Sequence, residues 1–149
     1  MEIERKFLIE NPPETYKEFP FRQIEQAYLC TNPVVRIRRE DSSYYLTYKS
    51  KGLLSREEYN LPLTEASYLH LREKADGNIL TKKRYLLPVI GRPDLTIELD
   101  VFEGKFEGLI LAEVEFASED DAKAFVPPDW FSRDVTFSGE YQNSRLSMQ

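Results

Sequence analysis

The chain has 149 residues, of which 41% are hydrophobic and 31% are charged, and its net charge at pH 7 is -6. A chain of this size and apolar content can bury a core of its own, so we expect one domain over residues 1–149. The acidic balance excludes a protein that covers nucleic acid with a broad basic face, and it requires any phosphate recognition to be local and concave.

Segments with the alternating pattern of β-strands follow one another along most of the chain. The turn residues at 41–43, 51–52 and 91–94 indicate hairpins, and hairpins make neighbouring strands antiparallel. The predicted strands span residues 2–9, 23–29, 34–39, 43–49, 56–61, 79–87, 94–102 and 109–116.

Helices are predicted at two interruptions of the strand pattern. Thr64 is placed to cap a helix over residues 65–72, and Ser118 is placed to cap one over residues 119–125. A short third helix is expected after Pro13. These helices are available to cover one face of the strands.

Charged residues recur two positions apart in strand after strand. Side chains two apart project to the same face of a strand, about 7 Å from each other. The apolar residues between them, such as Ile37, Leu99 and Val114, belong to the opposite face. The predicted inward-facing residues are Glu2, Glu4, Lys6, Arg36, Arg38, Thr47, Lys49, Arg56, Glu58, Asn60, Lys82, Arg84, Thr96, Glu98, Asp100, Glu113 and Glu115.

On one strand, a face exposed to solvent explains this pattern. Six strands that each carry charged residues on one face and apolar residues on the other favour a common cavity lined by the charged faces. Hairpin-linked strands that are covered by helices on their apolar side tend to curl, and closure removes exposed edges. The expected fold is therefore α+β: a closed antiparallel eight-stranded β-barrel, or tunnel, with a charged lumen and helices packed on the outside.

The charges themselves indicate the ligand. The predicted carboxylates would repel one another unless cations neutralise them, and oxygen-only ligands select Mg²⁺ or Mn²⁺ over zinc. The predicted cations require a polyanion, since guanidinium groups bind phosphoryl oxygens bidentately. A metal-chelated polyphosphate satisfies both. The carboxylates are Glu2, Glu4, Glu98, Asp100, Glu113 and Glu115, and the cations are Lys6, Arg36, Arg38, Lys49, Lys82 and Arg84.

The ordered set of charged motifs closely resembles the CYTH family, the triphosphate tunnel metalloenzymes. The resemblance extends to the end of the chain and is closest to short bacterial members. Glu140 departs from it, because an arginine usually precedes the tyrosine there. The matching motifs are Glu2-x-Glu4-x-Lys6, Arg36-x-Arg38, Thr47-x-Lys49, Lys82-x-Arg84-Tyr85, Glu98-x-Asp100, Glu113-x-Glu115, Val135-Thr136 and Tyr141-x-Asn143-x-x-Leu146.

The resemblance implies an eight-stranded tunnel that acts on triphosphates with Mg²⁺ or Mn²⁺, and we expect two ions. It assigns metal binding to Glu2, Glu4, Asp100, Glu113 and Glu115, with Glu58 and Glu98 in support. It assigns phosphate binding to Lys6, Arg36, Arg38, Lys49, Lys82 and Arg84. For catalysis we expect Arg84 and Lys82 to act on the phosphates, and Glu58 is the candidate general base.

The expected function is a metal-dependent hydrolase, an inorganic triphosphatase that releases orthophosphate from tripolyphosphate. Two alternatives remain open on the same fold. One is a nucleoside or thiamine triphosphatase, or a class IV-type adenylate cyclase, although the His-Phe signature of those cyclases is absent near the N-terminus. The other is a non-catalytic polyphosphate or nucleotide sensor.

The single cysteine, Cys30, excludes an intrachain disulfide and suits a reducing compartment. No segment approaches the roughly 20 apolar residues of a membrane span, and no basic leader precedes the first strand. We therefore expect a cytoplasmic protein whose partner is a small-molecule triphosphate, with neither nucleic acid nor membrane, as a monomer or homodimer.

Overall fold

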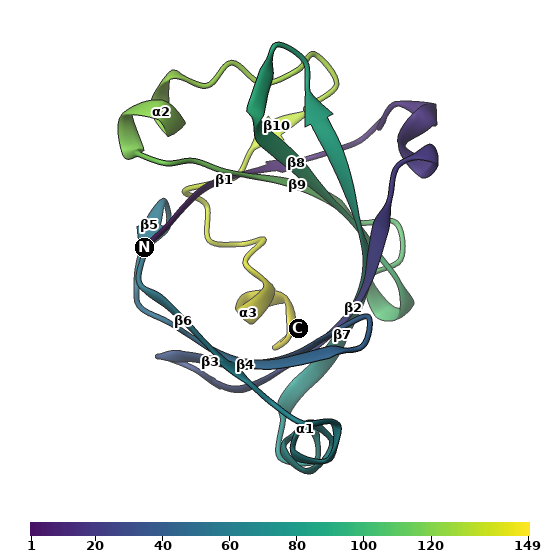
Figure 1. Ribbon diagram of the computed structural model, residues 1–149, viewed down its shortest axis with the longest axis vertical. Helices are drawn as coiled ribbons and strands as arrows, with labels where there is room; N and C mark the ends of the chain where they lie inside the picture. The colour runs from purple at the N-terminus through teal and green to yellow at the C-terminus, as the bar shows by residue number, and fades with distance from the viewer.

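The computed structural model describes residues 1–149 and arranges antiparallel strands in a ring (Figure 1). The sheet runs in the order β10-β1-β9-β8-β7-β2-β3-β4-β6, and β5 also pairs with β1. Its strands are β1 (Glu2–Leu8), β2 (Phe21–Thr31), β3 (Val34–Glu40), β4 (Ser43–Lys49), β5 (Ser55–Arg56), β6 (Glu58–Pro62), β7 (Asp76–Val89), β8 (Arg92–Phe102), β9 (Ile110–Glu115) and β10 (Arg133–Asp134).

The ring closes where β5 meets β1, through the residue pairs Glu2 with Arg56 and Ile3 with Ser55. β6 pairs with β4, and only Glu57 separates β5 from β6 in the chain. The path of paired strands therefore holds nine strands, where the sequence predicts eight, and β5 and β6 together take the place of the single strand predicted at residues 56–61. The short strand β10, which was not predicted, adds to the end of β1.

The predicted helices form at the expected places, and further short helices occur elsewhere. Thr64 caps α1 by accepting a hydrogen bond from the backbone N–H of Ser67, and Ser118 caps α2 in the same way through Asp121. No helix has the length and apolar composition that crossing a membrane requires. The helices are η1 (Glu14–Glu18), α1 (Glu65–Arg72), η2 (Gly104–Phe106), α2 (Glu119–Ala124) and α3 (Asn143–Leu146).

The hydrophobic core lies largely outside the ring, between the outer face of the strands and the elements that cover it. Leu99 and Val114 on β8 and β9 pack in one cluster with Phe125, which follows α2. Ile37 on β3 packs under Tyr68 of α1, which lies outside the ring in Figure 1. The apolar residues of the alternation therefore face outward, and the charged residues face inward.

The inner face changes character along the axis of the ring. At one end, Leu80, Phe102 and Leu111 occupy the same face as the charged residues of β7, β8 and β9, and they pack with Leu146 of α3. Figure 1 shows α3 within the outline of the ring. The C-terminal segment therefore helps to fill this end of the barrel with apolar side chains.

Candidate active site

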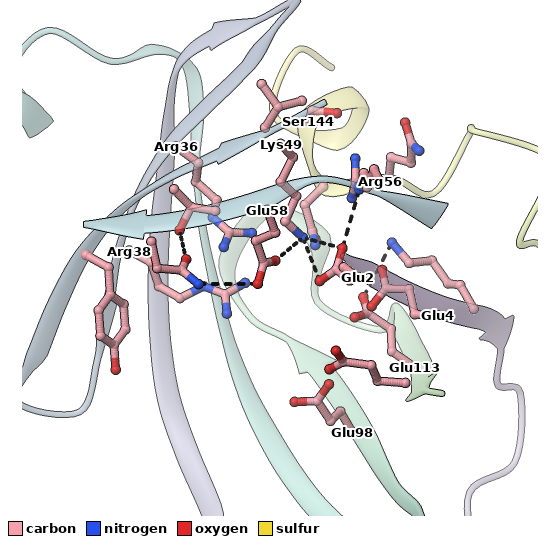
Figure 2. Close-up of a pocket in the computed structure, with 18 of the residues that line it drawn as sticks. Glu2, Glu4, Arg36, Arg38, Lys49, Arg56, Glu58, Glu98, Glu113 and Ser144 are labelled. Atoms are coloured by element: carbon pink, nitrogen blue, oxygen red, sulfur yellow. Dashed lines mark hydrogen bonds and ion pairs between the residues drawn. The ribbon is translucent and has the colours of Figure 1, made fainter. Parts of the chain in front are cut away.

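The ring encloses a cavity of about 370 Å³ that is lined by 21 residues, of which only Tyr28, Val34 and Tyr45 are hydrophobic (Figure 2). Charged side chains of both signs dominate the remaining wall. The cations are Lys6, Arg36, Arg38, Lys49, Arg56 and Arg84, and the carboxylates are Glu2, Glu4, Glu40, Glu58, Glu98, Glu113 and Glu115.

Most of the predicted site residues line this cavity, and the exceptions are Lys82 and Asp100. Both side chains have zero exposed area and form an ion pair of 2.6 Å behind the wall. Asp100 also accepts hydrogen bonds of 2.7 and 2.9 Å from the guanidinium of Arg84. Both oxygens of Asp100 are thus occupied by cations, and its direct effect in this structure is to position Arg84 and Lys82.

Burial acts strongly on Lys82. Loss of hydration lowers the pKa of its ammonium group to about 7, although the neighbouring Asp100 carboxylate opposes the shift. Arg84 differs, because Asp100, Glu98 and Glu113 surround it and hold its pKa well above the ordinary value. Arg84 therefore reaches the cavity as a permanent cation in a fixed orientation.

Arg36 is the cavity cation without a protein partner. Its side chain forms no ion pair within 4.0 Å, and its buried Nε has no hydrogen-bond acceptor. By contrast, the guanidinium of Arg38 donates to Gln26 Oε1 at 2.8 and 3.1 Å. A buried guanidinium is costly unless something accepts its hydrogen bonds, so this part of the wall is suited to an anionic ligand.

Lys49 lies between two carboxylates at the β4 wall. Its ammonium group is 3.0 Å from Glu2 and 3.3 Å from Glu58, and Arg56 approaches Glu2 at 3.4 Å. Burial opposes ionisation of Glu58, but hydrogen bonding with Glu2 and the charge of Lys49 hold the pKa of Glu58 at about 2. A carboxylate of such low basicity is a weak general base near neutral pH.

Glu4 and Glu115 are the cavity carboxylates that have no cationic partner. They lie directly opposite each other on β1 and β9, where the side chains of a pair share a face and their Cβ atoms are about 5 Å apart. Burial, followed by the charges of Glu113 and Glu2, raises the pKa of Glu4 to about 8. Burial and neighbouring carboxylates also raise the pKa of Glu115.

Each of these carboxylates fits a hard divalent cation, because a bound cation would relieve the repulsion from Glu2 that raises the pKa of both, and because the donors are oxygens. No three His, Cys, Asp or Glu side chains converge where they could hold an ion on their own. Magnesium commonly binds through one or two carboxylates and completes its ligand set with water and phosphate oxygens. The residues are therefore suited to a metal that arrives with a phosphate ligand.

Glu4→Gln is expected to flatten the pH dependence of stability of the ligand-free protein. Because the pKa of Glu4 rises from 4.5 to about 8, the folded state binds more protons than the unfolded state within that interval. The free energy of unfolding therefore falls as pH rises through it, and the substitution removes this contribution. Thermal unfolding at about pH 5 and about pH 8 measures the slope, and the exposed Glu107→Gln is the control. Equal slopes in parent and Glu4→Gln would contradict the assignment.

The cavity also includes residues that were not predicted to bind ligand. Glu40 continues the inward alternation of Arg36 and Arg38, so the same period of two could have identified it. Gln142, Asn143 and Ser144 reach the wall from the C-terminal segment, for which no strand pattern exists. Asn143 Oδ1 is buried there without a hydrogen-bond donor.

Comparison with known proteins gives a consistent result. The model of the CYTH domain matches residues 1–147. An inorganic triphosphatase of Nitrosomonas europaea is 39% identical over 99% of this chain and 97% of its own length. An inorganic triphosphatase of Acetivibrio thermocellus is 34% identical over 97% of this chain and 92% of its own length.

Solved structures share the architecture. The crystal structure of the inorganic triphosphatase NE1496 has a TM-score of 0.73 at 36% identity and covers 100% of this chain and 95% of its own. A putative adenylate cyclase from Bacillus halodurans has a TM-score of 0.60 at 18% identity, covering 100% of this chain and 92% of its own. At that identity the second similarity concerns the fold alone.

Proposed function

Because the chain belongs to the CYTH family, we propose that it is a divalent-metal-dependent hydrolase that releases orthophosphate from inorganic tripolyphosphate. Two relatives that carry the name inorganic triphosphatase align over nearly its whole length, which supports the proposal. We propose that the chain acts as one domain and works in the cytoplasm, in keeping with its single cysteine.

The observation that carries the proposal is the unpartnered, buried guanidinium of Arg36 in a cavity whose wall is mostly charged and almost entirely polar. A chain of phosphates supplies acceptors along its length and needs no apolar platform. A nucleoside or thiamine group would need aromatic or apolar contacts, and the wall offers only Tyr28, Val34 and Tyr45. The composition of the cavity therefore favours an inorganic substrate.

Phosphoryl transfer requires of the protein mainly positioning and neutralisation of charge. We propose that Arg36, Arg38 and Arg84 bind the phosphoryl oxygens bidentately, and that Lys6 and Lys49 bind them as point charges. Asp100 fixes the guanidinium plane of Arg84 through two hydrogen bonds. Through Asp100, Lys82 belongs to the same rigid group and lies behind the phosphate-binding wall.

Glu4 and Glu115 would hold Mg²⁺ or Mn²⁺, with Glu2, Glu98 and Glu113 beside them, and we propose two ions. When bound, the metal supplies charge neutralisation and lowers the pKa of a water molecule. Glu2 and Glu113 are ion-paired to cations of the same wall, at 3.0 Å to Lys49 and 3.4 Å to Lys6. These pairs keep the ligand-free cavity close to electrical balance.

Phosphate release from tripolyphosphate, ATP and thiamine triphosphate, measured with Mg²⁺ and with Mn²⁺, tests the proposed function. Glu115→Gln is expected to lower tripolyphosphate turnover by about 100-fold at a fixed metal concentration, because it removes one of the two unpaired carboxylates. The exposed Glu107→Gln is the matched control. Near-normal turnover in Glu115→Gln at saturating Mg²⁺ would count against the metal assignment.

The same assay separates the other functions. Formation of a cyclic nucleotide from ATP would identify a cyclase, and preferred release from ATP or thiamine triphosphate would identify an organic substrate. If tripolyphosphate raises the melting temperature but is never consumed with either metal, the chain is a sensor.

A further inference from the structure

A second, smaller pocket of about 190 Å³ lies beside the end of the barrel that α3 fills. Its walls come from the turn between β2 and β3, the loop after β4 and the C-terminal segment that enters α3. We call it the side pocket. Of the charged motifs of the sequence, only Thr47-x-Lys49 contributes to its lining, and the function proposed above does not use the pocket itself.

The side pocket adjoins the main cavity. Lys49, Arg56 and Ser144 line both spaces, and so do Val34 and Gln142. Figure 2 shows Lys49, Arg56 and Ser144 at the same end of the main cavity. These shared residues place the side pocket next to the part of the main cavity that Lys49 and Arg56 line.

The charge of the side pocket differs from that of the main cavity. Its lining includes Lys49, Lys51 and Arg56 and no carboxylate. Lys49 and Arg56 both pair with Glu2, whose carboxylate belongs to the main cavity. Lys51 is exposed on the pocket loop and forms no ion pair within 4.0 Å. The side pocket therefore presents positive charge and an unpaired ammonium group.

Hydrogen bonds and a glycine fix the backbone conformation of the loop that carries Lys51. Ser50 donates its backbone N–H to Glu57 and accepts the backbone N–H of Glu57 on its hydroxyl. Gly52 has a φ of +142°, and a Cβ there would lie 2.1 Å from the carbonyl oxygen of Ser55. Only glycine is compatible with this close approach, so the loop holds Lys51 beside the pocket in a defined conformation.

We propose that the side pocket is a second phosphate-binding site, which takes a phosphate group that has left or extends beyond the main cavity. The proposal rests on the proposed function. The phosphate group has two sources: orthophosphate released by hydrolysis, or the terminal group of a linear polyphosphate longer than tripolyphosphate. Both present the same tetrahedral anion to Lys51, Lys49 and Arg56.

The test uses Lys51→Glu with Lys74→Glu as its control, since Lys74 is exposed and lies outside both pockets. Both variants make the same change in net charge. Titration calorimetry with orthophosphate, without metal, measures binding whether or not the chain is a hydrolase. Inhibition by orthophosphate and the KM values for tripolyphosphate and linear tetrapolyphosphate are measured with Mg²⁺.

Lys51→Glu is expected to weaken orthophosphate binding about tenfold and to leave the KM for tripolyphosphate within about twofold of the parent. If Lys51→Glu weakens inhibition by orthophosphate to the same extent and leaves the KM for tetrapolyphosphate unchanged, the occupant is the released product. A tenfold rise in KM for tetrapolyphosphate identifies the longer chain. Equal effects of Lys51→Glu and Lys74→Glu on every anion would overturn the proposal. If tripolyphosphate is not hydrolysed but calorimetry separates the variants, the side pocket stands and the proposed function fails.

Discussion

Arg36→Gln is expected to lower kcat/KM for tripolyphosphate by about 1,000-fold while leaving the free energy of unfolding unchanged or raising it by about 1 kcal/mol. Activity falls without a loss of stability because Arg36 has no protein partner in the cavity. Its charge is uncompensated until an anion binds, and it also repels Arg38, which burial and Arg36 together hold at a pKa of about 10. Removing the charge of Arg36 removes its repulsion with Arg38 in the ligand-free cavity, and it deprives the substrate of a bidentate hydrogen-bond donor.

The control for this prediction is Arg39→Gln on the same strand. Arg39 points to the outer face, is exposed, and donates to the backbone carbonyl of Asp41. It is expected to change neither turnover nor stability appreciably, because exposed pairs contribute little. The two variants are compared by phosphate release and by urea unfolding. If Arg36→Gln loses stability and keeps its turnover, Arg36 is a structural residue and the assignment to phosphate is wrong.

The strands and the direction of their side chains could be predicted from the sequence because both follow from local rules. A period of two assigns Arg36 and Lys49 to the inside and Ile37 to the outside, and β3 and β4 confirm this alternation. Turn residues at 41–43 likewise predict the hairpin between these strands. Such features require no knowledge of distant parts of the chain.

The position of each inward-facing side chain along the barrel axis could not be predicted in this way. Lys82 and Arg84 share one face of β7, but only Arg84 lines the cavity. Lys82 lies nearer the end that Leu80, Phe102 and Leu146 fill, and its ammonium group is 5.2 Å from the centre of the Phe102 ring. The alternation specifies a face, whereas packing from β8 and α3 decides which charged groups meet solvent.

The C-terminal segment was recognised only as a motif of the family, and its contribution to the cavity wall was not predicted, for a related reason. Gln142 and its neighbours reach the cavity in a segment with little regular structure, so no periodic pattern marks their direction. Their position depends on contacts far away in the chain, such as the hydrogen bond from the ammonium group of Lys6 to the carbonyl of Tyr141 at 3.2 Å. Contacts of this kind join residues more than a hundred positions apart.

Asp100→Asn is expected to lower the free energy of unfolding by about 3–5 kcal/mol, since it leaves buried cations without their carboxylate. Asp100 has no exposed side-chain area and is bonded to both Lys82 and Arg84. The loss should be greatest below about pH 7, where Lys82 of the folded parent is still charged, and smaller above it. Burial lowers the pKa of Lys82 to about 7 and the charge of Asp100 opposes this shift, so removing that charge lowers the pKa further and the folded variant sheds this proton at a lower pH than the folded parent does.

Lys82→Met tests whether the loss of stability is specific to Asp100 or follows from any substitution in this buried ion-paired group. It removes one cation but leaves Asp100 its two hydrogen bonds to Arg84, at 2.7 and 2.9 Å. It should therefore cost less stability than Asp100→Asn and should retain more of the tripolyphosphate turnover, because Arg84 keeps its orientation. Urea unfolding of both variants at several pH values, with kcat and KM for each, measures the difference. Equal losses of stability and turnover in the two variants would mean that Lys82, Asp100 and Arg84 act only through packing and that Asp100 does not position Arg84.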